Sequence, residues 1–442
     1  MLQKSLPLSP KGENSVSEIE KRKNTATITL KPKNIFIVIL LCLVFAVFMD
    51  KSLEMFLGPI LALSMIYLYF TGYTALVTAI IVVANAALGT VIFGKLSFQY
   101  LLLALALIKL LVQNKLSRKD LVFLLISTVL MLLAHFVQKL DIRNLLFSMS
   151  YILGLLVMDK GENSQRQFFQ SVAITVTLIA LHACITGGVE FIEVGPYGKE
   201  SLRRGIIGVG IGDANMSCVL LGFGLCCIWN VAGWGKIWKI IASALILYAI
   251  ALTMSISGLL LLLVLIVAST LFRQKKRKSV MALLLVAAVI LLLVVVYLNL
   301  PADMHIEQVD AYILRVEEKL GLLESGNYAD ATTNRTAIAS KYWTYFWEQS
   351  VFNVFFGGLK LNALGEVPHN TYLDMLLQTG VIGFLAIFGW IVAQIVQVWR
   401  NKKLEYRKTK LALKIMCLTV ATNLSLYQGS LWALWLYFMV LL

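Results

Sequence analysis

Residues 367–384, with the sequence VPHNTYLDMLLQTGVIGF, place a histidine and an asparagine where a long polar segment turns into an apolar one. Pro368 prevents a helix from running back into the polar segment, so a helix is expected to begin at Asn370 or Thr371. His369 therefore lies at the mouth of this helix. Because a neutral imidazole can take up a proton near pH 7, His369 is a candidate general base, and the alternative is a role in helix entry or capping.

Polar and small residues follow His369 at helical spacing. Asn370 can cap the helix or bind the hydroxyl groups of a sugar. It lies four residues before Asp374, so the two share a helix face and can hydrogen-bond. Gly380 and Gly383 lie three residues apart, and small residues allow a neighbouring backbone to approach closely. We expect these glycines to pack the helix and thereby to fix the position of His369.

Three arginines could recognise phosphate. Arg335 lies in TTNRTAIASKYW at the expected start of a helix, and Arg203 and Arg204 precede a glycine-rich entry into an apolar segment. A guanidinium near a helix amino terminus adds its charge to the positive end of the helix dipole, and it can grip phosphate oxygens with two parallel hydrogen bonds. The alternative for each arginine is contact with lipid headgroups.

The composition indicates the elements that must hold these residues. The chain has 442 residues, of which 59% are hydrophobic and 14% are charged, and its mean hydropathy is +0.81. Soluble domains carry roughly a quarter charged residues, and a span needs about 20 mostly apolar residues. The sequence predicts an all-α, polytopic membrane protein with about 12–14 transmembrane helices. The candidate spans lie near 35–49, 55–71, 73–93, 97–113, 120–137, 144–158, 168–189, 213–231, 238–254, 256–272, 279–299, 371–398, 411–428 and 431–442.

The net charge of +15 follows from topology rather than from nucleic-acid binding. Lysines and arginines gather in the short connections on alternate sides of the spans, as the positive-inside rule expects. Residues 1–34 form a basic cytoplasmic tail, and residues 35–442 form a single transmembrane domain. With the amino terminus inside, the two long loops, residues 190–212 and 300–368, fall on the outer side.

The second of these loops is expected to carry interfacial helices. Val309, Ile313, Val316 and Leu320 recur at intervals of three or four residues, which makes one amphipathic face. A second segment, around Trp343, is crowded with aromatic residues, which prefer the level of the lipid headgroups. A loop of this length in a compact membrane protein is usually functional.

Other kinds of site lack sequence support. The histidines and acidic residues show no metal-ligand spacing, and the six cysteines lie in apolar stretches as small core residues. No nucleotide-binding loop is present, so an activated substrate must bring its own energy. We therefore expect no metal and no cofactor.

The motifs together resemble those of the bacterial O-antigen ligase and polysaccharide polymerase family. The histidine and asparagine followed by GVIG are similar to the signature that opens a late transmembrane helix in that family. The segment NRTAIASKYWTYFWEQSVFNVFFGGL is similar to the family's arginine, tryptophan and glycine turn, although Phe356-Gly357-Gly358 departs from the usual spacing. The segment RRGIIGVGIGDANMS is similar to an earlier family segment, with Asn215 after Ala214 in place of the frequent proline. The specific motifs cover residues 203–217 and 335–384.

The resemblance implies a metal-independent glycosyltransferase of the bacterial cytoplasmic (inner) membrane, with an active site that faces outward. The donor would be a glycan on undecaprenyl pyrophosphate, and the acceptor a saccharide. His369 would deprotonate the acceptor hydroxyl group, while Arg335, with Arg203 or Arg204, would bind the pyrophosphate. Further substrate contacts are expected from Asn370, Asn215, Trp343 and Tyr372. Membrane lipids, a chain-length regulator and a flippase are further expected partners, and nucleic acid is not.

The sequence leaves several functions open. The favoured one is a polymerase that joins lipid-linked repeat units into capsular, exo- or O-antigen polysaccharide. A ligase would instead transfer the finished chain to a lipid A core or a protein. A flippase or transporter would show internal repeats and buried charges near the membrane midplane. No repeat is visible, and Lys109 is the only basic residue clearly within a span in the first half of the chain. A peptidoglycan glycosyltransferase would use a similar donor, but the His-Asn motif fits it poorly.

Overall fold

The computed structural model describes residues 32–88, 91–93, 96–112, 116–139, 141–187, 189–194, 200–205, 214–230, 235–253, 255–271, 295–301, 307–332, 334–404, 406–423 and 429–442. By internal packing the chain divides into two units, Met1–Val44 and Phe45–Leu442. The described part of the first unit is the start of helix α2 (Pro32–Met49). All other described elements belong to the second unit. Most of the expected tail and most of the expected span at 279–299 lie outside the described residues.

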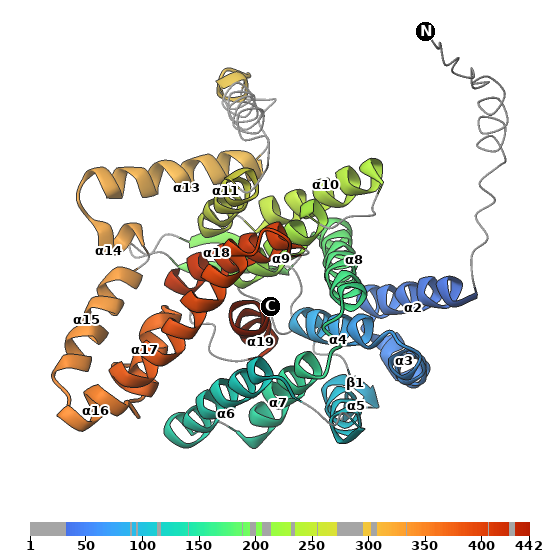
Figure 1. Cartoon of the computed structure of the whole chain (residues 1–442). Coiled ribbons are helices and arrows are strands. Elements are labelled where there is room, and N and C mark those ends of the chain that lie inside the picture. The colour runs from blue at the N-terminus through green and yellow to red at the C-terminus, as the bar shows by residue number, and fades with distance from the viewer. Residues whose placement is uncertain are drawn as a thin grey trace, which may run out of the picture. The chain divides into compact units, whose positions relative to one another are not determined.

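Helices occur where the apolar segments predict them (Figure 1). The largest difference is at α8, which begins at Glu162 rather than near residue 168. The helices in the expected spans are α2, α3 (Glu54–Phe70), α4 (Thr74–Leu88), α5 (Phe98–Val112), α6 (Arg118–Gln138), α7 (Ile142–Leu156), α8 (Glu162–Thr186), α9 (Ala214–Asn230), α10 (Lys236–Leu252), α11 (Ile256–Leu271), α17 (Thr371–Arg400), α18 (Arg407–Asn423) and α19 (Gly429–Leu436). A 3-10 turn, η1 (Lys51–Leu53), precedes α3, and a π-helical turn, η3 (Tyr437–Leu441), follows α19.

Three of these helices, α6, α8 and α17, are long and apolar enough to cross a membrane by themselves. Several shorter apolar helices accompany them. The all-α, polytopic membrane class is thus confirmed, with two small hairpins as the exceptions among the described residues. One hairpin joins β1 (Val91–Phe93) to β2 (Leu96–Ser97).

The second hairpin was not predicted. Strands β3 (Val189–Val194) and β4 (Glu200–Gly205) pair antiparallel over six residues each, within the segment expected to be a loop. In this register Arg203 lies opposite Phe191 and Arg204 lies opposite Glu190. β-Branched and aromatic residues in β3 favour a strand. The sequence predicts a loop here because the segment is too short and too polar to be a membrane span.

The carboxyl-terminal elements form the centre of the second unit. Helix α19 contacts α4 and α7, while η3 contacts α6, α17 and α18 (Figure 1). Trp435 and Phe438 are fully buried there, and the Trp435 indole nitrogen donates to the backbone oxygen of Cys417 at 2.9 Å. The fully buried Lys414 of α18 donates to the carbonyls of Phe438 and Met439, so its side-chain nitrogen satisfies two backbone acceptors of the π-helical turn.

Helix α17 consists of two segments that meet at Gly380, whose backbone is non-helical (φ 65°, ψ −176°). Before this kink nearly every residue is buried, so this segment is embedded in protein. After it the buried positions are Ile387, Ile391, Gln394 and Val398, which form a single stripe at helical spacing. Residues 381–400 rise by about 30 Å, which matches the hydrocarbon core of a bilayer. The second segment therefore has the length and the exposed apolar surface of a lipid-facing span.

The long polar segment before α17 is largely helical, as predicted. It contains α13 (Glu307–Glu324), α14 (Tyr328–Ala331), α15 (Arg335–Trp347) and α16 (Val351–Phe356). Helices α15 and α16 both contact α17 (Figure 1). Buried side chains of α15, the following loop and the first segment of α17 form one apolar cluster, which consists of Tyr342, Phe346, Leu359, Leu361, Leu373, Leu376 and Leu377.

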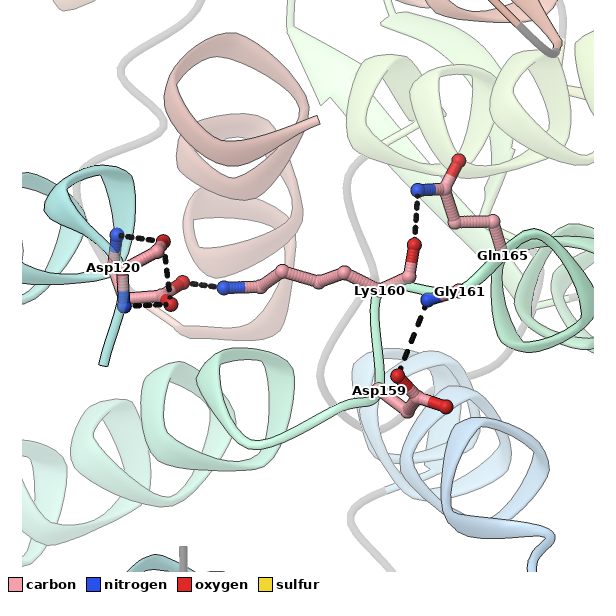
Figure 2. A network of polar contacts seen from close by, with 6 residues as sticks. Asp120, Asp159, Lys160, Gly161 and Gln165 are labelled. Carbon is pink, nitrogen blue, oxygen red and sulfur yellow. Dashed lines mark hydrogen bonds and ion pairs between the residues drawn. The ribbon is translucent and has the colours of Figure 1, made fainter. Parts of the chain in front are cut away.

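The two ends of α6 contact different parts of the chain. At its start, Ser117 and Asp120 form a capping box, and Lys160 forms an ion pair with Asp120 (Figure 2). The Gln165 side chain donates to the Lys160 carbonyl at 2.8 Å. At its end, about 30 Å away along the axis, Gln138 contacts the loop before α17. The basic residues Arg118, Lys119 and Lys160 and the loop that leads to His369 therefore lie at opposite ends of α6.

Candidate functional site

His369 has a left-handed backbone (φ 52°), which a side chain with a Cβ rarely adopts. Such a conformation costs about 1–2 kcal/mol, so it persists only where the surrounding structure holds it. Buried Pro368 precedes His369, and the half-buried histidine immediately precedes the cap of α17. His369 itself is therefore not the helix cap. Its side chain stands at the junction between the outer segment and α17, as the sequence predicts.

Asn370 caps α17. Its side-chain oxygen accepts from the backbone nitrogens of Tyr372 and Leu373 at 3.0 and 3.1 Å, and its amide nitrogen donates to the Thr422 carbonyl at 3.3 Å. Of the two roles expected for Asn370, capping is the one seen in this structure. The Tyr372 hydroxyl group donates to the Leu418 carbonyl at 3.0 Å, so both side chains fasten the start of α17 to α18. Their roles in substrate binding stay predictions.

Arg335 is the first residue of α15, as predicted. Tyr342 and Phe346, two and three turns later, belong to the cluster that packs on α17, and Ile338, one turn later, packs against that cluster. This spacing places Arg335 on the same face of α15. The Thr332 hydroxyl oxygen accepts from the backbone nitrogen of Thr336, so part of the helix start is already capped. A bound phosphate would therefore depend chiefly on the guanidinium group.

Tyr342 connects α15 to the segment that leads to His369. Its hydroxyl group donates to the Glu366 carbonyl and accepts from the Leu364 backbone nitrogen at 3.1 Å. Burial raises the pKa of Tyr342, so the hydroxyl group stays protonated and remains a donor at neutral pH. Glu366 lies three residues before His369, and Arg335 lies about 10 Å along α15 from Tyr342. Tyr342 thus connects the helix that begins at Arg335 to the segment that leads to His369, and the meeting of the two side chains at one site stays a prediction.

The segment of residues 203–217 contains three other predicted site residues, which are Arg203, Arg204 and Asn215. Arg203 and Arg204 lie in β4, which contacts α9. Asn215, near the start of α9, is buried, and its side-chain oxygen accepts from the Ser255 hydroxyl group at 2.7 Å. A further contact, between the Cys218 sulfur and the Thr253 hydroxyl group at 3.0 Å, lies in the same buried region. The link between this region and His369 stays a prediction.

Exposed aromatic and apolar side chains cover the outside of α15 and α16. Trp343 is 52% exposed and packs edge to face on Trp347, with ring centroids 5.6 Å apart. Phe352 and Phe356 on α16 are also exposed and pack together. These surfaces suit the headgroup level of a membrane. Trp343 is not part of the buried cluster, and its contact with substrate stays a prediction.

A cavity of about 20 Å³ lies against the first segment of α17. The apolar part of its lining comes from α6, α7, α17 and α19, and the polar side chains are His135, Asn144, Ser148, Thr371, Asp374 and Gln378. Asp374 and Gln378 are each 2% exposed. Within the described part of the chain, the Gln378 amide nitrogen and the His135 Nδ1 have no hydrogen-bond partner. The volume fits about one water molecule, which could satisfy both groups.

The two glycines singled out in the sequence have different roles. A Cβ on Gly380 would collide with the backbone of Phe355 and Phe356, so Gly380 permits the close approach that was predicted. Gly357 is its counterpart, because a Cβ there would collide with the backbone of Gln378 and Gly380. A Cβ on Gly383 would meet only the side chain of Thr379 on the same helix. The prediction of close backbone packing is thus met at Gly380 and not at Gly383.

Several residues that shape this region were not predicted. Gln138 and Tyr342 hold the loop between α16 and α17, and Gln378 lines the cavity together with Asp374, which the sequence indicated only as a partner for Asn370. Only one signal could have indicated the last pair: two polar residues four apart on an apolar helix. Among the described residues, no group of three or more His, Cys, Asp or Glu side chains is arranged to hold a metal ion.

Comparison with known families gives one match. Residues 241–388 match the family model described as O-antigen ligase, and this segment contains α15, α16, His369 and most of α17. The match confirms the resemblance to the O-antigen ligase and polymerase family that the motifs indicate. Searches of curated proteins and of solved structures found no match.

Proposed function

Because residues 241–388 carry the O-antigen ligase domain, we propose that this protein is a membrane glycosyltransferase that moves a glycan from undecaprenyl pyrophosphate to a sugar hydroxyl group. The observation that carries the proposal is His369 itself. It has a strained left-handed backbone, between a buried proline and the cap of an embedded helix segment. Strain of this kind gathers at functional sites, where the surrounding contacts maintain it.

In the proposed reaction His369 accepts the proton of the acceptor hydroxyl group. The acceptor oxygen forms a bond to the anomeric carbon of the donor sugar, and the bond from that carbon to the pyrophosphate oxygen breaks. The electron pair of this bond leaves with the lipid pyrophosphate. The proton stays on the imidazole until it passes to solvent. A general base of this kind contributes about 10²–10⁴ in rate.

Arg335 would neutralise the charge that develops on the leaving pyrophosphate. It stands at the amino terminus of α15, on the face that packs toward α17. Removing one well-placed group that stabilises developing charge commonly costs about 10²–10³ in rate. Arg203 or Arg204 would share this role, and their place before α9 is compatible with it. Because the pyrophosphate is already an activated leaving group, the proposed reaction requires no nucleotide and no metal.

The proposed site faces the outside of the bacterial cytoplasmic membrane. His369 and the α15–α16 region lie at the end of α6 that is opposite to Ser117, Asp120 and Lys160. Basic connections belong on the cytoplasmic side, so the opposite end is the outer one. Lipid-linked substrates and membrane lipids would reach it along the exposed apolar surfaces of α16 and the second segment of α17.

Two versions of the transfer differ in their acceptor. In a polymerase the acceptor is a sugar of another lipid-linked repeat unit, and this is the version that we favour. In the second version, a ligase transfers the finished chain to a lipid A core or a protein, and the match to the O-antigen ligase family is compatible with either version. Both versions require the same base and the same lipid pyrophosphate. Capsule, exopolysaccharide and O-antigen are the expected classes of product.

The test is the pattern of lipid-linked glycans in a deletion strain. Single lipid-linked repeat units would support the polymerase, whereas full polymer that is not attached to its acceptor would support the ligase. The strain is then complemented with His369→Ala or Arg335→Ala. The control is Lys341→Ala, which removes an exposed basic side chain on the same helix as Arg335. The first two variants should insert into the membrane and fail to restore polymer. Normal polymer in either variant would refute the proposal.

A further inference from the structure

Gln138, the last residue of α6, binds the loop that joins α16 to α17. Its side-chain nitrogen donates to the Leu359 carbonyl at 3.0 Å, and its side-chain oxygen accepts from the Leu361 backbone nitrogen at 2.9 Å. One amide thus satisfies two backbone groups more than 220 residues away in the sequence. A residue of a neighbouring parallel strand would offer the same donor and acceptor to residues 359 and 361.

The same loop is held from its other side by the kinked helix. The backbone nitrogens of Gly358 and Leu359 donate to the carbonyls of Gln378 and Leu377 at 2.8 and 3.0 Å. These carbonyls belong to the turn of α17 that precedes the kink at Gly380. The loop therefore bridges α6 and α17 through hydrogen bonds to both helices.

The loop that Gln138 binds continues along the chain to His369 and is held at further points. Leu359 and Leu361 are buried in the cluster that contains Tyr342, and the Tyr342 hydroxyl group holds the Leu364 nitrogen and the Glu366 carbonyl. The chain from residue 357 to the cap of α17 is thus fixed at successive points. The left-handed conformation at His369 needs such a restraint, because an unrestrained chain would relax out of it.

We propose that Gln138 is a positioning residue for the glycan transfer, because it holds residues 358–369 so that the His369 imidazole meets the acceptor hydroxyl group. This inference rests on the proposed function. The chemistry requires glutamine. Leucine offers neither a donor nor an acceptor, ionised glutamate lacks the donor, and asparagine is one methylene group shorter, so it reaches neither backbone group.

The test uses the full chain in lipid nanodiscs and begins with backbone hydrogen exchange. In Gln138→Leu and Gln138→Asn, the amides of residues 358–364 should exchange roughly 10-fold faster or more, because the loop loses two hydrogen bonds. The control is Gln165→Leu, which removes a glutamine that also donates to a backbone carbonyl but lies at the opposite end of α6. Wild-type exchange in both Gln138 variants would overturn the inference.

Kinetics with a purified lipid-linked glycan donor form the second readout. Misplacing the base should lower kcat by roughly 10-fold while KM for the donor stays within about twofold, since small displacements of reacting groups are costly. Gln138→Glu, which keeps the acceptor for Leu361, should fall between the wild type and Gln138→Leu. Faster exchange with an unchanged kcat would refute the positioning role. If the His369→Ala variant is also fully active, the proposed function fails, and that result is independent of the exchange data.

Discussion

The backbones at Gly380 and Gly357 approach each other closely, and this close approach leads to a prediction for Gly380→Ala. Gly380 combines φ 65° with ψ −176°, a region that is reached essentially only by glycine. A Cβ there would also meet the carbonyl group of Phe355 and the backbone nitrogen of Phe356, neither of which can rotate away. The backbone strain costs about 1–3 kcal/mol, and overpacking costs about 1–3 kcal/mol more. We therefore expect a destabilisation of about 2–6 kcal/mol.

Gly389 on the same helix provides a matched control. It lies in the second segment of α17, and a Cβ there would have no atom within 4 Å. Alanine in a helix interior is about 1 kcal/mol more favourable than glycine, so Gly389→Ala should be neutral or stabilising. The contrast between the two variants thus depends on the kink and not on the change of residue type.

The assay is the apparent melting temperature in nanodiscs at a fixed heating rate, because membrane proteins often unfold irreversibly. Gly380→Ala should melt several degrees below the wild type or fail to accumulate, while Gly389→Ala should melt at or above it. In a form of Gly380→Ala that does accumulate, transfer activity should also fall, because the loop that leads to His369 is displaced. Equal melting temperatures for the two variants would refute the close backbone approach at Gly380.

Three other changes test neighbouring parts of the account. His369→Gly should relieve about 1 kcal/mol of backbone strain, so its melting temperature should equal or exceed that of the wild type. The same variant should lower the transfer rate by about 10²–10⁴, because it lacks the base. A wild-type rate with purified donor would contradict the role of His369 as base. Arg335→Lys should retain partial activity, since lysine keeps the charge but loses the two-pronged geometry, whereas Arg335→Ala should lose about 10²–10³ in kcat in the same assay. Tyr342→Phe should destabilise the protein by about 1–3 kcal/mol in thermal unfolding, because the Glu366 carbonyl and the Leu364 nitrogen lose their hydrogen-bond partner. Tyr345→Phe is the control. Equal melting temperatures for the two variants would contradict the role of Tyr342 in holding this loop.

The positions of the helices could be predicted because each span requires a long apolar run, and that requirement is local. The helical content of the segment around Arg335 could be predicted for the same reason, from its spacing of apolar residues. The hairpin of β3 and β4 could not, because six-residue strands give a weak local signal and their pairing depends on two segments together.

The candidate site was predicted in part. The sequence indicated His369 at the start of a helix and Arg335 at the start of another, and both lie there. It offered two roles for Asn370, and the structure shows capping. The kink at Gly380 and the hydrogen bonds of Gln138 depend on tertiary contacts between distant segments, which composition and spacing do not reveal.

The most direct measurement is an experimental structure of the full chain with undecaprenyl pyrophosphate bound. It should show the pyrophosphate in contact with the Arg335 guanidinium group and with Arg203 or Arg204, and the His369 imidazole beside the position that the sugar would occupy. A lipid pyrophosphate bound instead at the start of α6, beside Asp120 and its ion-pair partner Lys160 and remote from His369, would contradict the account.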